Sequence, residues 1–316
     1  MAGLPVRGIK TVVESVEDGG HGVKVYTLCD PDLWELPPFR PGAHIDMHLP
    51  GGLVRTYSLC NDPVDDKHYV IAVKREANGR GGSIAFHDEV KAGDTLIVSL
   101  PRGGLRLDDA PHVTFVAGGI GVTPFLSAAG YLARRGRDFT LHVIARGEPP
   151  LATILAPHRA SGHAIIHDTV TSIRPALEAL IDTTPPDAML ACCGPLDMLD
   201  AFERATRSWP TERVHLERFV PPPLLVDPQA RPFRLVLARS HREIEVSLGV
   251  SILEALLGAG IDIPASCCGG ICGACRIDWL EGTPVHRDRV LSTTERARSL
   301  MACVSGSAEE RLVVDL

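Results

Sequence analysis

Four cysteines gather in SCCGGICGAC, the stretch from Ser266 to Cys275. Three of them, Cys267, Cys272 and Cys275, have the spacing C-x4-C-x2-C, and Cys303 follows well downstream. Plant-type [2Fe-2S] sites hold iron with cysteine thiolates at this spacing. The glycines between the cysteines permit unusual backbone angles and leave amides free to point at sulfur, which stabilises added negative charge. The spacing therefore predicts that these four cysteines are metal ligands.

A structural zinc site is the alternative for these cysteines, because zinc also binds thiolates. Such sites normally pair two C-x2-C units or add histidines, and the second pair is missing here. His286 lies between the third and fourth cysteines, but its setting in TPVHRD predicts a surface histidine. Cys268 falls outside the spacing and is predicted to be a neighbour of the ligands. The nine cysteines of the chain form an odd and unevenly clustered set, which disfavours disulfides.

Two glycine-containing turns predict a dinucleotide site. In FVAGGIGVTP, Gly118, Gly119 and Gly121 lie between a strand and a helix, where backbone amides and the helix dipole can face a pyrophosphate. A second turn, CCGP, ends a later strand, so it is expected at the same edge of the sheet, where ligands of such folds bind. Close packing of a strand on a helix is the alternative reason for these glycines.

A third phosphate signal lies in VRTYSL, where Arg55 and Tyr57 alternate onto one face of a strand. They offer a guanidinium for a phosphate and an aromatic plane for a flat ring. An ordinary edge strand with a surface arginine would give the same pattern. NGRGGSIAFHD adds a glycine-rich helix start at Gly81, Gly82 and Ser83, where one phosphate could bind.

Three structural elements are predicted to position these residues: a β-barrel, a parallel sheet and a segment that follows a linker. Short β-prone runs that alternate with turns predict a small antiparallel β-barrel over residues 1–108, with one helix at GGSIAFHDEV. From His112 strands alternate with helices, which predicts a parallel sheet, although a loop is expected after TLHVIAR. A proline-rich stretch predicts a linker. Beyond it, FRLVLA and EIEVSL predict a hairpin, and SILEALLGAG a helix with a capping box of Ser251 and Glu254 that ends at Gly260.

The composition fits this multidomain organisation. At 316 residues the chain has room for two or three domains, and its 45% hydrophobic and 22% charged residues are typical of a globular protein. A net charge of −7 argues against nucleic-acid binding. The first residues lack the basic flank and apolar run of a signal peptide, so we expect a cytoplasmic protein. Neither a G-x-S-x-G nor an H-E-x-x-H motif occurs.

The order of RTYS, IAVKRE, GRGGS, GGIGVTP, CCGP, HLERF and the cysteine cluster resembles the phthalate dioxygenase reductase family over essentially the whole chain. The resemblance implies an FMN-binding barrel over residues 1–108 and an NAD-binding α/β domain over 109–222. It implies a linker over 223–232 and a β-grasp ferredoxin domain with a [2Fe-2S] cluster over 233–316. It also implies hydride transfer from NADH to FMN, and single-electron transfer through the cluster to a separate Rieske-type aromatic oxygenase or O-demethylase.

The resemblance also implies roles for individual residues. Ser58 would approach the reactive N5 of the flavin, Cys193 would lie near the nicotinamide, and Phe219 would close the pocket, so these three are the candidate catalytic residues. Arg146 could contact adenosine or a 2′-phosphate. The expected flavin contacts are Arg55, Thr56, Tyr57, Ser58, Ala72, Val73, Lys74, Gly81, Gly82 and Ser83. The expected dinucleotide contacts are Gly118, Gly119, Gly121, Thr123, Arg146, Cys193, Gly194 and Pro195.

Two features depart from the family pattern. Cys268 stands where relatives more often carry a polar residue. IARGEPP lacks an acidic residue at the end of its strand, so NADPH is an alternative to NADH. Two other functions also fit the sequence, the same electron path serving a cytochrome P450 and a non-catalytic redox sensor. We expect a monomer.

Overall fold

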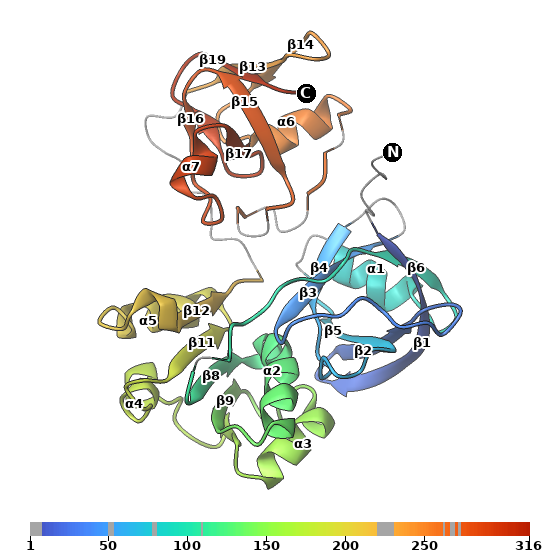
Figure 1. Cartoon of the computed structure of the whole chain (residues 1–316), viewed down its shortest axis with the longest axis vertical. Helices are drawn as coiled ribbons and strands as arrows, with labels where there is room; N and C mark the ends of the chain where they lie inside the picture. Colours follow the sequence, from blue (N-terminus) through green and yellow to red (C-terminus); the bar gives the residue numbers. More distant parts are fainter. Residues whose placement is uncertain are drawn as a thin grey trace. The chain divides into compact units, whose positions relative to one another are not determined.

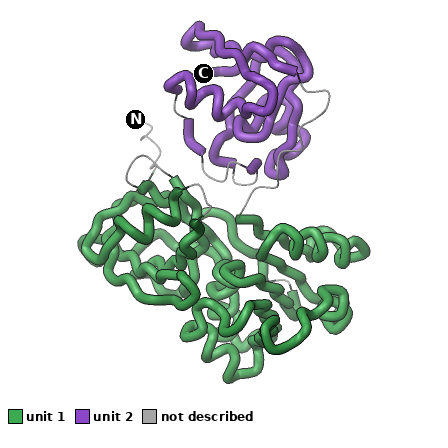
Figure 2. The backbone as a smooth tube through the Cα atoms, turned by 180° about the vertical axis from the view of Figure 1, so that it is seen from behind, with its two compact units in different colours: residues 1–219 green, residues 220–316 purple. Residues whose placement is uncertain are grey.

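The computed structural model describes residues 8–49, 54–77, 81–108, 110–219, 231–261, 263–265, 269–270 and 273–316. The chain divides into two compact units, residues 1–219 and residues 220–316 (Figure 2). Three of the clustered cysteines, Cys267, Cys268 and Cys272, and most of the predicted linker lie outside the described residues. In the part that is described, no helix is long and apolar enough to cross a membrane.

The first half of unit 1 is the predicted antiparallel barrel. Its described strands follow the order β4-β3-β6-β1-β2-β5, and β7 pairs with β3. A single bridge between Leu59 and Ile71 joins the two ends of this path. The elements are β1 (Ile9–Gly20), β2 (Val23–Cys29), β3 (Ala43–His48), β4 (Val54–Ser58), β5 (His68–Lys74), α1 (Gly82–Glu89), β6 (Thr95–Val98) and β7 (Arg102–Gly103).

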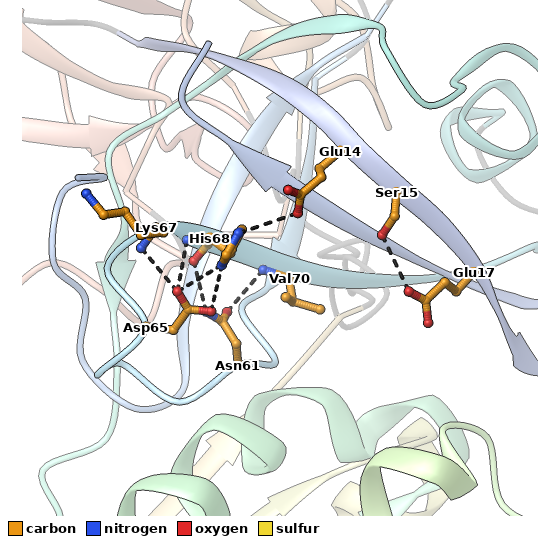
Figure 3. Close-up of polar contacts among 8 residues, drawn as sticks. All are labelled: Glu14, Ser15, Glu17, Asn61, Asp65, Lys67, His68 and Val70. Atoms are coloured by element: carbon orange, nitrogen blue, oxygen red, sulfur yellow. Dashed lines mark hydrogen bonds and ion pairs between the residues drawn. The ribbon is translucent and has the colours of Figure 1, made fainter. Parts of the chain in front are cut away.

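The sequence did not predict β1, the long first strand of the barrel. Its register with β2 shifts between Val13 and Ser15, which leaves Glu14 as the extra residue of a β-bulge. The Glu14 carboxylate lies 3.4 Å from Nε2 of His68, while both Asp65 oxygens lie 3.0 Å from Nδ1 (Figure 3). Amide Nδ2 of Asn61 donates to the carbonyl of His68 at 2.8 Å. These contacts fix the turn before β5 against β1.

An aromatic cluster fills the barrel beneath α1. The ring of Phe86 is fully buried, and it meets Tyr26 and Tyr57 edge to face at centroid distances of 4.6 and 5.3 Å. The Tyr26 hydroxyl donates to the carbonyl of Phe86 at 3.1 Å. Because α1 is held by this ring, its first residues have a fixed position relative to β4.

The second half of unit 1 is a parallel sheet with the order β10-β9-β8-β11-β12. Every residue of β8 is buried, as expected for a central strand covered on both faces. In Figure 1, α2 and α3 lie apart from α4 and α5, and separate hydrophobic cores form under the two groups. The elements are β8 (Val113–Gly118), α2 (Thr123–Arg134), β9 (Phe139–Ala145), α3 (Ala152–Ala160), β10 (Ala164–Asp168), α4 (Leu177–Asp182), β11 (Met189–Cys193), α5 (Leu196–Ala205) and β12 (Val214–Glu217).

The loop expected after β9 is wrong, because α3 occupies this position. Pro157 lies inside α3, and a proline in that place argues against a helix when only the sequence is read. The start of α3 docks on the barrel instead. The amide of Leu151 donates to the carbonyl of Gly19 at 2.8 Å, and a Cβ atom at Gly19 would lie 2.9 Å from the Leu151 side chain. Tertiary packing thus supports a helix that the local sequence does not favour.

Unit 2 has the β-grasp arrangement, a mixed sheet with α6 packed on it. The described strands follow the order β14-β13-β19-β15-β17, in which β13 and β19 are parallel. The predicted hairpin is β13 and β14, and the predicted capping box at the start of α6 is confirmed. The elements are β13 (Phe233–Leu237), β14 (Arg242–Val246), α6 (Ile252–Gly258), β15 (Arg276–Glu281), β16 (Pro284–Val285), α7 (Thr293–Arg296), β17 (Ser299–Met301), β18 (Gly306–Ser307) and β19 (Arg311–Val314).

Replacing Ser251 with alanine should destabilise α6, because Glu254 loses the hydroxyl that caps its amide at 3.1 Å. A lost N-cap costs about 1 kcal/mol, which corresponds to about fivefold faster opening. Hydrogen exchange of the α6 amides in the full chain would measure this change. Ser247→Ala, at an exposed position before the helix, is the control and should leave these rates unchanged. Equal exchange in both variants would contradict the role of the cap.

Candidate flavin, dinucleotide and iron–sulfur sites

The two turns predicted to bind a dinucleotide meet at the carboxyl edge of the parallel sheet. A Cβ atom at Gly121 would lie 2.3 Å from the carbonyl oxygen of Cys193, closer than any side chain allows. A Cβ atom at Gly118 would lie 2.7 Å from Pro195 and 2.8 Å from Met198. Glycine at these positions therefore lets the turn after β8 pack directly on the turn after β11. The close packing that was the alternative reason for these glycines is real.

The same geometry leaves the start of α2 at the point where the strand order reverses. Strands β9 and β10 follow on one side of β8, and β11 and β12 follow on the other. Open α/β sheets bind ligands in the crevice at this position. Gly119 has a φ of +54°, and the Thr123 hydroxyl donates to the carbonyl of Ile120 at 3.0 Å. Backbone amides at the start of α2 are thus held where a pyrophosphate could accept their hydrogen bonds.

Cys193 ends β11 as a fully buried residue. Burial raises the pKa of its thiol well above the ordinary value, and the nearby Glu217 and Cys192 raise that pKa further. The thiol is consequently neutral at physiological pH and cannot act as a thiolate nucleophile. Phe219, in contrast, is 43% exposed at the end of the described part of unit 1.

The arginine predicted to bind a phosphate lies directly over the start of α1. A Cβ atom at Gly82 would lie 2.4 Å from Nε of Arg55, so a larger residue at this position would force the arginine side chain to move. Gly81 has a φ of +79° at the N-cap, and the Ser83 hydroxyl accepts a hydrogen bond from the amide of Glu76 at 3.1 Å. A guanidinium and a helix N-terminus are therefore brought together, the two groups that bind a phosphate most readily.

Tyr57 lies on the same face of β4 as Arg55, because both contact α1. Burial raises the pKa of Tyr57 to about 12, and Arg55 offsets only part of that rise. Thr56 points to the other face, where its hydroxyl donates to Asp46 at 2.8 Å. The predicted contact of Thr56 with a ligand is thus limited to its backbone.

Strands β4 and β5 diverge next to this tyrosine. The bridge between Leu59 and Ile71 is antiparallel, which brings Ser58 toward Ala72. No further pairing between β4 and β5 is found among the described residues, although the strands remain neighbours. The backbone edge of β5 from Ala72 to Lys74 consequently borders the gap, with the carbonyl of Val73 bound to His87 at 2.7 Å. A flat polar ring could bind between these two strands.

Two of the four predicted cluster ligands are described: Cys275 comes directly before β15, and Cys303 lies in the turn after β17, the strand that pairs with β15. The amide of Ala302 donates to the carbonyl of Cys275 at 3.0 Å, so Cys275 and Cys303 flank the same backbone contact. Each is 3% exposed. Gly270 has a φ of +70°, and a Cβ atom added to it would lie 2.7 Å from the side chain of Val304. Part of the cysteine loop thus packs on the turn that carries Cys303.

The prediction of a surface histidine at His286 is wrong. Its Nδ1 is buried, 3.6 Å from a carboxylate oxygen of Asp288, whose side chain is fully buried. Leu291 donates its amide to the same carboxylate at 2.9 Å, and Arg296 donates to the Asp288 carbonyl at 2.6 Å. The motif TPVHRD contains Asp288 itself but carries no sign of this burial, because Leu291 and Arg296, which contact the Asp288 carboxylate, lie beyond the motif.

The sequence also missed Asp168, which ends β10 beside the turn that carries Arg146. The Asp168 carboxylate accepts hydrogen bonds from the amides of Gly147 and Val170, both at 2.8 Å, and from the hydroxyl of Thr171. These hydrogen bonds lower its pKa, so the group is ionised at neutral pH. An acidic residue is therefore present at this edge of the sheet, on the strand next to the predicted one, while Arg146 is exposed.

Gly121→Ala should separate the turns after β8 and β11, because the new Cβ atom cannot occupy the position of the Cys193 oxygen. Steric strain of this kind typically costs about 1–3 kcal/mol, so the melting temperature of unit 1 should fall. Gly130→Ala in α2 is the matched control, since its nearest neighbour is at 3.4 Å. Calorimetry of both variants would measure the difference. A melting temperature equal to that of Gly130→Ala would contradict the proposed close contact.

Comparisons with known proteins agree with a separate C-terminal unit in residues 220–316. A family described as the 2Fe-2S iron-sulfur cluster binding domain matches residues 235–306. The chain is 40% identical to phenoxybenzoate dioxygenase subunit beta of Ectopseudomonas oleovorans, with 96% of each protein covered. It is similar to the structure of phthalate dioxygenase reductase, which is titled a modular structure for electron transfer from pyridine nucleotides to [2Fe-2S]. That match has a TM-score of 0.75 and 36% identity, and covers 98% of each chain.

A second solved structure gives a similar match. It is an intact type IV self-sufficient cytochrome P450 monooxygenase, with a TM-score of 0.81 and 34% identity. The match covers 98% of this chain and 41% of the P450 chain. The predicted combination of barrel, parallel sheet and ferredoxin domain is confirmed by these matches. The full-length similarity shows that the chain is an oxidoreductase of the phthalate dioxygenase reductase family, the flavin and iron–sulfur reductases of oxygenase systems.

Proposed function

We propose that the protein takes a hydride from NADH onto FMN and delivers single electrons through a [2Fe-2S] cluster to a separate Rieske-type aromatic oxygenase or O-demethylase. The observation that carries this proposal is the pair of glycine-dependent cradles in unit 1, beneath Arg55 and beside Cys193. When bound, the flavin and the cluster supply the conversion of a two-electron hydride donor into single electrons. The chain supplies the positions of these groups and the exclusion of water.

The residues of the barrel fit FMN. Arg55 and the α1 N-terminus would hold the flavin phosphate, with Gly82 leaving room for the guanidinium. A phosphate monoester carries up to two negative charges, whereas each phosphate of a dinucleotide carries one, so this cationic cradle favours FMN over FAD. Tyr57 would lie against the ring, and the backbone from Ala72 to Lys74 would bind its polar edge. Ser58 would lie closest to the reacting atom.

Arg55→Ala should weaken FMN binding about 10- to 100-fold, because a charged hydrogen-bond partner of the phosphate is lost. Fluorescence titration of the flavin-free protein with FMN would measure the dissociation constant. Arg55→Lys, which keeps the charge, should lose less. An unchanged dissociation constant in Arg55→Ala, or tighter binding of FAD than of FMN by the native protein, would contradict the assignment.

The crevice beside β8 fits the nicotinamide dinucleotide. Gly118, Gly119, Gly121 and Thr123 would hold the pyrophosphate, with Gly194 and Pro195 at the opposite wall. The neutral thiol of Cys193 would border the nicotinamide, and Phe219 would cover it. The ionised Asp168 beside Arg146 supports NADH as the donor, because its charge disfavours the extra phosphate of NADPH.

Cys267, Cys272, Cys275 and Cys303 would hold the cluster. The burial of Cys275 and Cys303 supports this assignment, because a shielded site limits access of water and oxygen to the metal. We further propose domains at residues 1–108, 109–222 and 233–316, with a linker at 223–232; β8 begins at Val113 and β13 at Phe233. A monomer suffices, since one chain carries all of these residues. Buried thiols such as Cys29 and Cys60 suit the reducing cytoplasm.

Cys303→Ser should remove the cluster and leave reduction of the flavin by NADH intact, because the two sites belong to different units. Anaerobic stopped-flow spectroscopy would show flavin bleaching at the native rate, while NADH-dependent reduction of a one-electron acceptor protein falls at least about tenfold. Cys268→Ser is the matched control and should keep the cluster spectrum. If Cys303→Ser keeps the spectrum, or if the folded variant loses flavin reduction as well, the assignment of ligands or of modules is wrong.

A haem monooxygenase is the second candidate for the electron acceptor. The observation that favours it is the similarity of this whole chain to part of a self-sufficient cytochrome P450. Steady NADH-dependent turnover with a Rieske oxygenase, compared with turnover with a P450 under equal conditions, separates the two acceptors. Absence of turnover with any artificial acceptor would favour the redox sensor instead.

A further inference from the structure

Four arginines of unit 2 lie on the segment that runs from β16 through α7 to β17. We name Arg287, Arg289, Arg296 and Arg298 the arginine strip. Arg289 and Arg298 are exposed, and Arg287 and Arg296 are half-buried. The segment from His286 to Arg298 contains two carboxylates against these four arginines, although the chain as a whole has a net charge of −7. Positive charge is thus concentrated in one short segment of an acidic protein.

The strip adjoins the predicted cluster site on two sides. Nη1 of Arg287 donates to the carbonyl of Val304 at 3.2 Å, one residue after Cys303. The amide of Arg289 donates to the carbonyl of Gly270 at 3.0 Å, within the cysteine loop. Electrons that leave through the cluster therefore leave beside these arginines.

The two carboxylates of the segment form hydrogen bonds and ion pairs within unit 2. The side chain of Asp288 is fully buried, where it accepts the amide of Leu291 and approaches Arg296. Glu295 closes the capping box of α7 and pairs with Arg276 at 2.9 Å. Asp288 thus offsets the charge of Arg296, and neither carboxylate forms a described ion pair with Arg287 or Arg298.

Two arginines of the strip keep their charge available to solvent. Among the described residues, the guanidinium of Arg298 has no ion pair, and that of Arg287 has a hydrogen bond to the carbonyl of Val304 and no ion pair. Val290, which is 41% exposed, adds an apolar side chain next to Arg289. An apolar contact with a charged rim is the usual composition of a transient protein interface.

We infer that the arginine strip is the docking surface for an acidic face of the protein that accepts electrons from the cluster. The inference rests on the proposed function, because it requires that electrons leave through the cluster. Complementary charge would speed the encounter and orient the acceptor beside Cys303, and the attraction would weaken with salt. A partner that is acidic at its electron-entry face fits this surface, and a basic one is repelled by it.

The test uses the oxidised full-length protein and a flavodoxin, a strongly acidic electron carrier, as the probe. Isothermal titration calorimetry at ionic strengths of about 0.01 M and about 0.15 M would give the dissociation constants. We expect binding at low ionic strength that weakens with salt. Arg298→Glu should weaken it about threefold and Arg287→Glu/Arg298→Glu about tenfold. Arg231→Glu/Arg234→Glu has the same change of charge at the start of β13 and should change the constant less than about twofold.

Arg298→Glu keeps the inference testable if the double variant fails to fold, because the Arg298 guanidinium forms no hydrogen bond or ion pair with the described part of the chain. Absence of binding at low ionic strength, or equal effects of the strip and control variants, would overturn the inference. Visible absorption with NADH under anaerobic conditions separates the two proposals. If NADH reduces the cluster but binding of flavodoxin does not depend on the arginine strip, the proposed function is supported and only the docking surface is contradicted.

Discussion

The carbonyl oxygen of Cys193 occupies the space that a side chain at position 121 would need. This contact sets how closely β8 and β11 can approach at their carboxyl ends. The strand order reverses between these strands, so the same contact lies at the position where open α/β sheets bind ligands. A larger residue would widen the crevice and displace the amides at the start of α2. One steric constraint thus determines both the packing of the sheet and the position of the amides that we propose to bind phosphate.

In the barrel a side chain lies close to a glycine in the same way as the Cys193 carbonyl lies close to Gly121. The Arg55 side chain passes close over Gly82, which places its guanidinium beside the α1 N-terminus. The position of α1 depends in turn on Phe86, which is held between Tyr26 and Tyr57. An apolar core therefore orients a charged group, and the entropy of holding the arginine is lost on folding and not on binding.

Residue patterns predicted those parts of the fold that local chemistry determines. The cysteine spacing, the turns at Gly118 and Gly81 and the capping box at Ser251 depend on neighbours in the chain, and they could be read from it. The strand β1 and the helix α3 could not, because charged residues cover the outer face of β1 and Pro157 opposes α3. Both are held by contacts with distant residues. His286 and Asp168 escaped for another reason: Asp288, Val170 and Thr171 are neighbours in the chain, but the sequence does not show which way these side chains turn. Only Gly147, a further partner of Asp168, comes from a distant segment.

Separate units suit a chain in which the cluster must receive electrons from the flavin and then pass them to an external acceptor. Flavin and dinucleotide have to meet in a fixed geometry for a hydride to pass, and the barrel and parallel sheet share one core within unit 1. Single-electron transfer does not require such a fixed orientation. The cluster must also approach two groups in turn, the flavin and an external acceptor. A second unit with its own core, joined to the first by the chain, suits this requirement, because covalent connection keeps the effective concentration of the cluster high. The division between residues 219 and 220 therefore falls where the chemistry changes from hydride to single electrons.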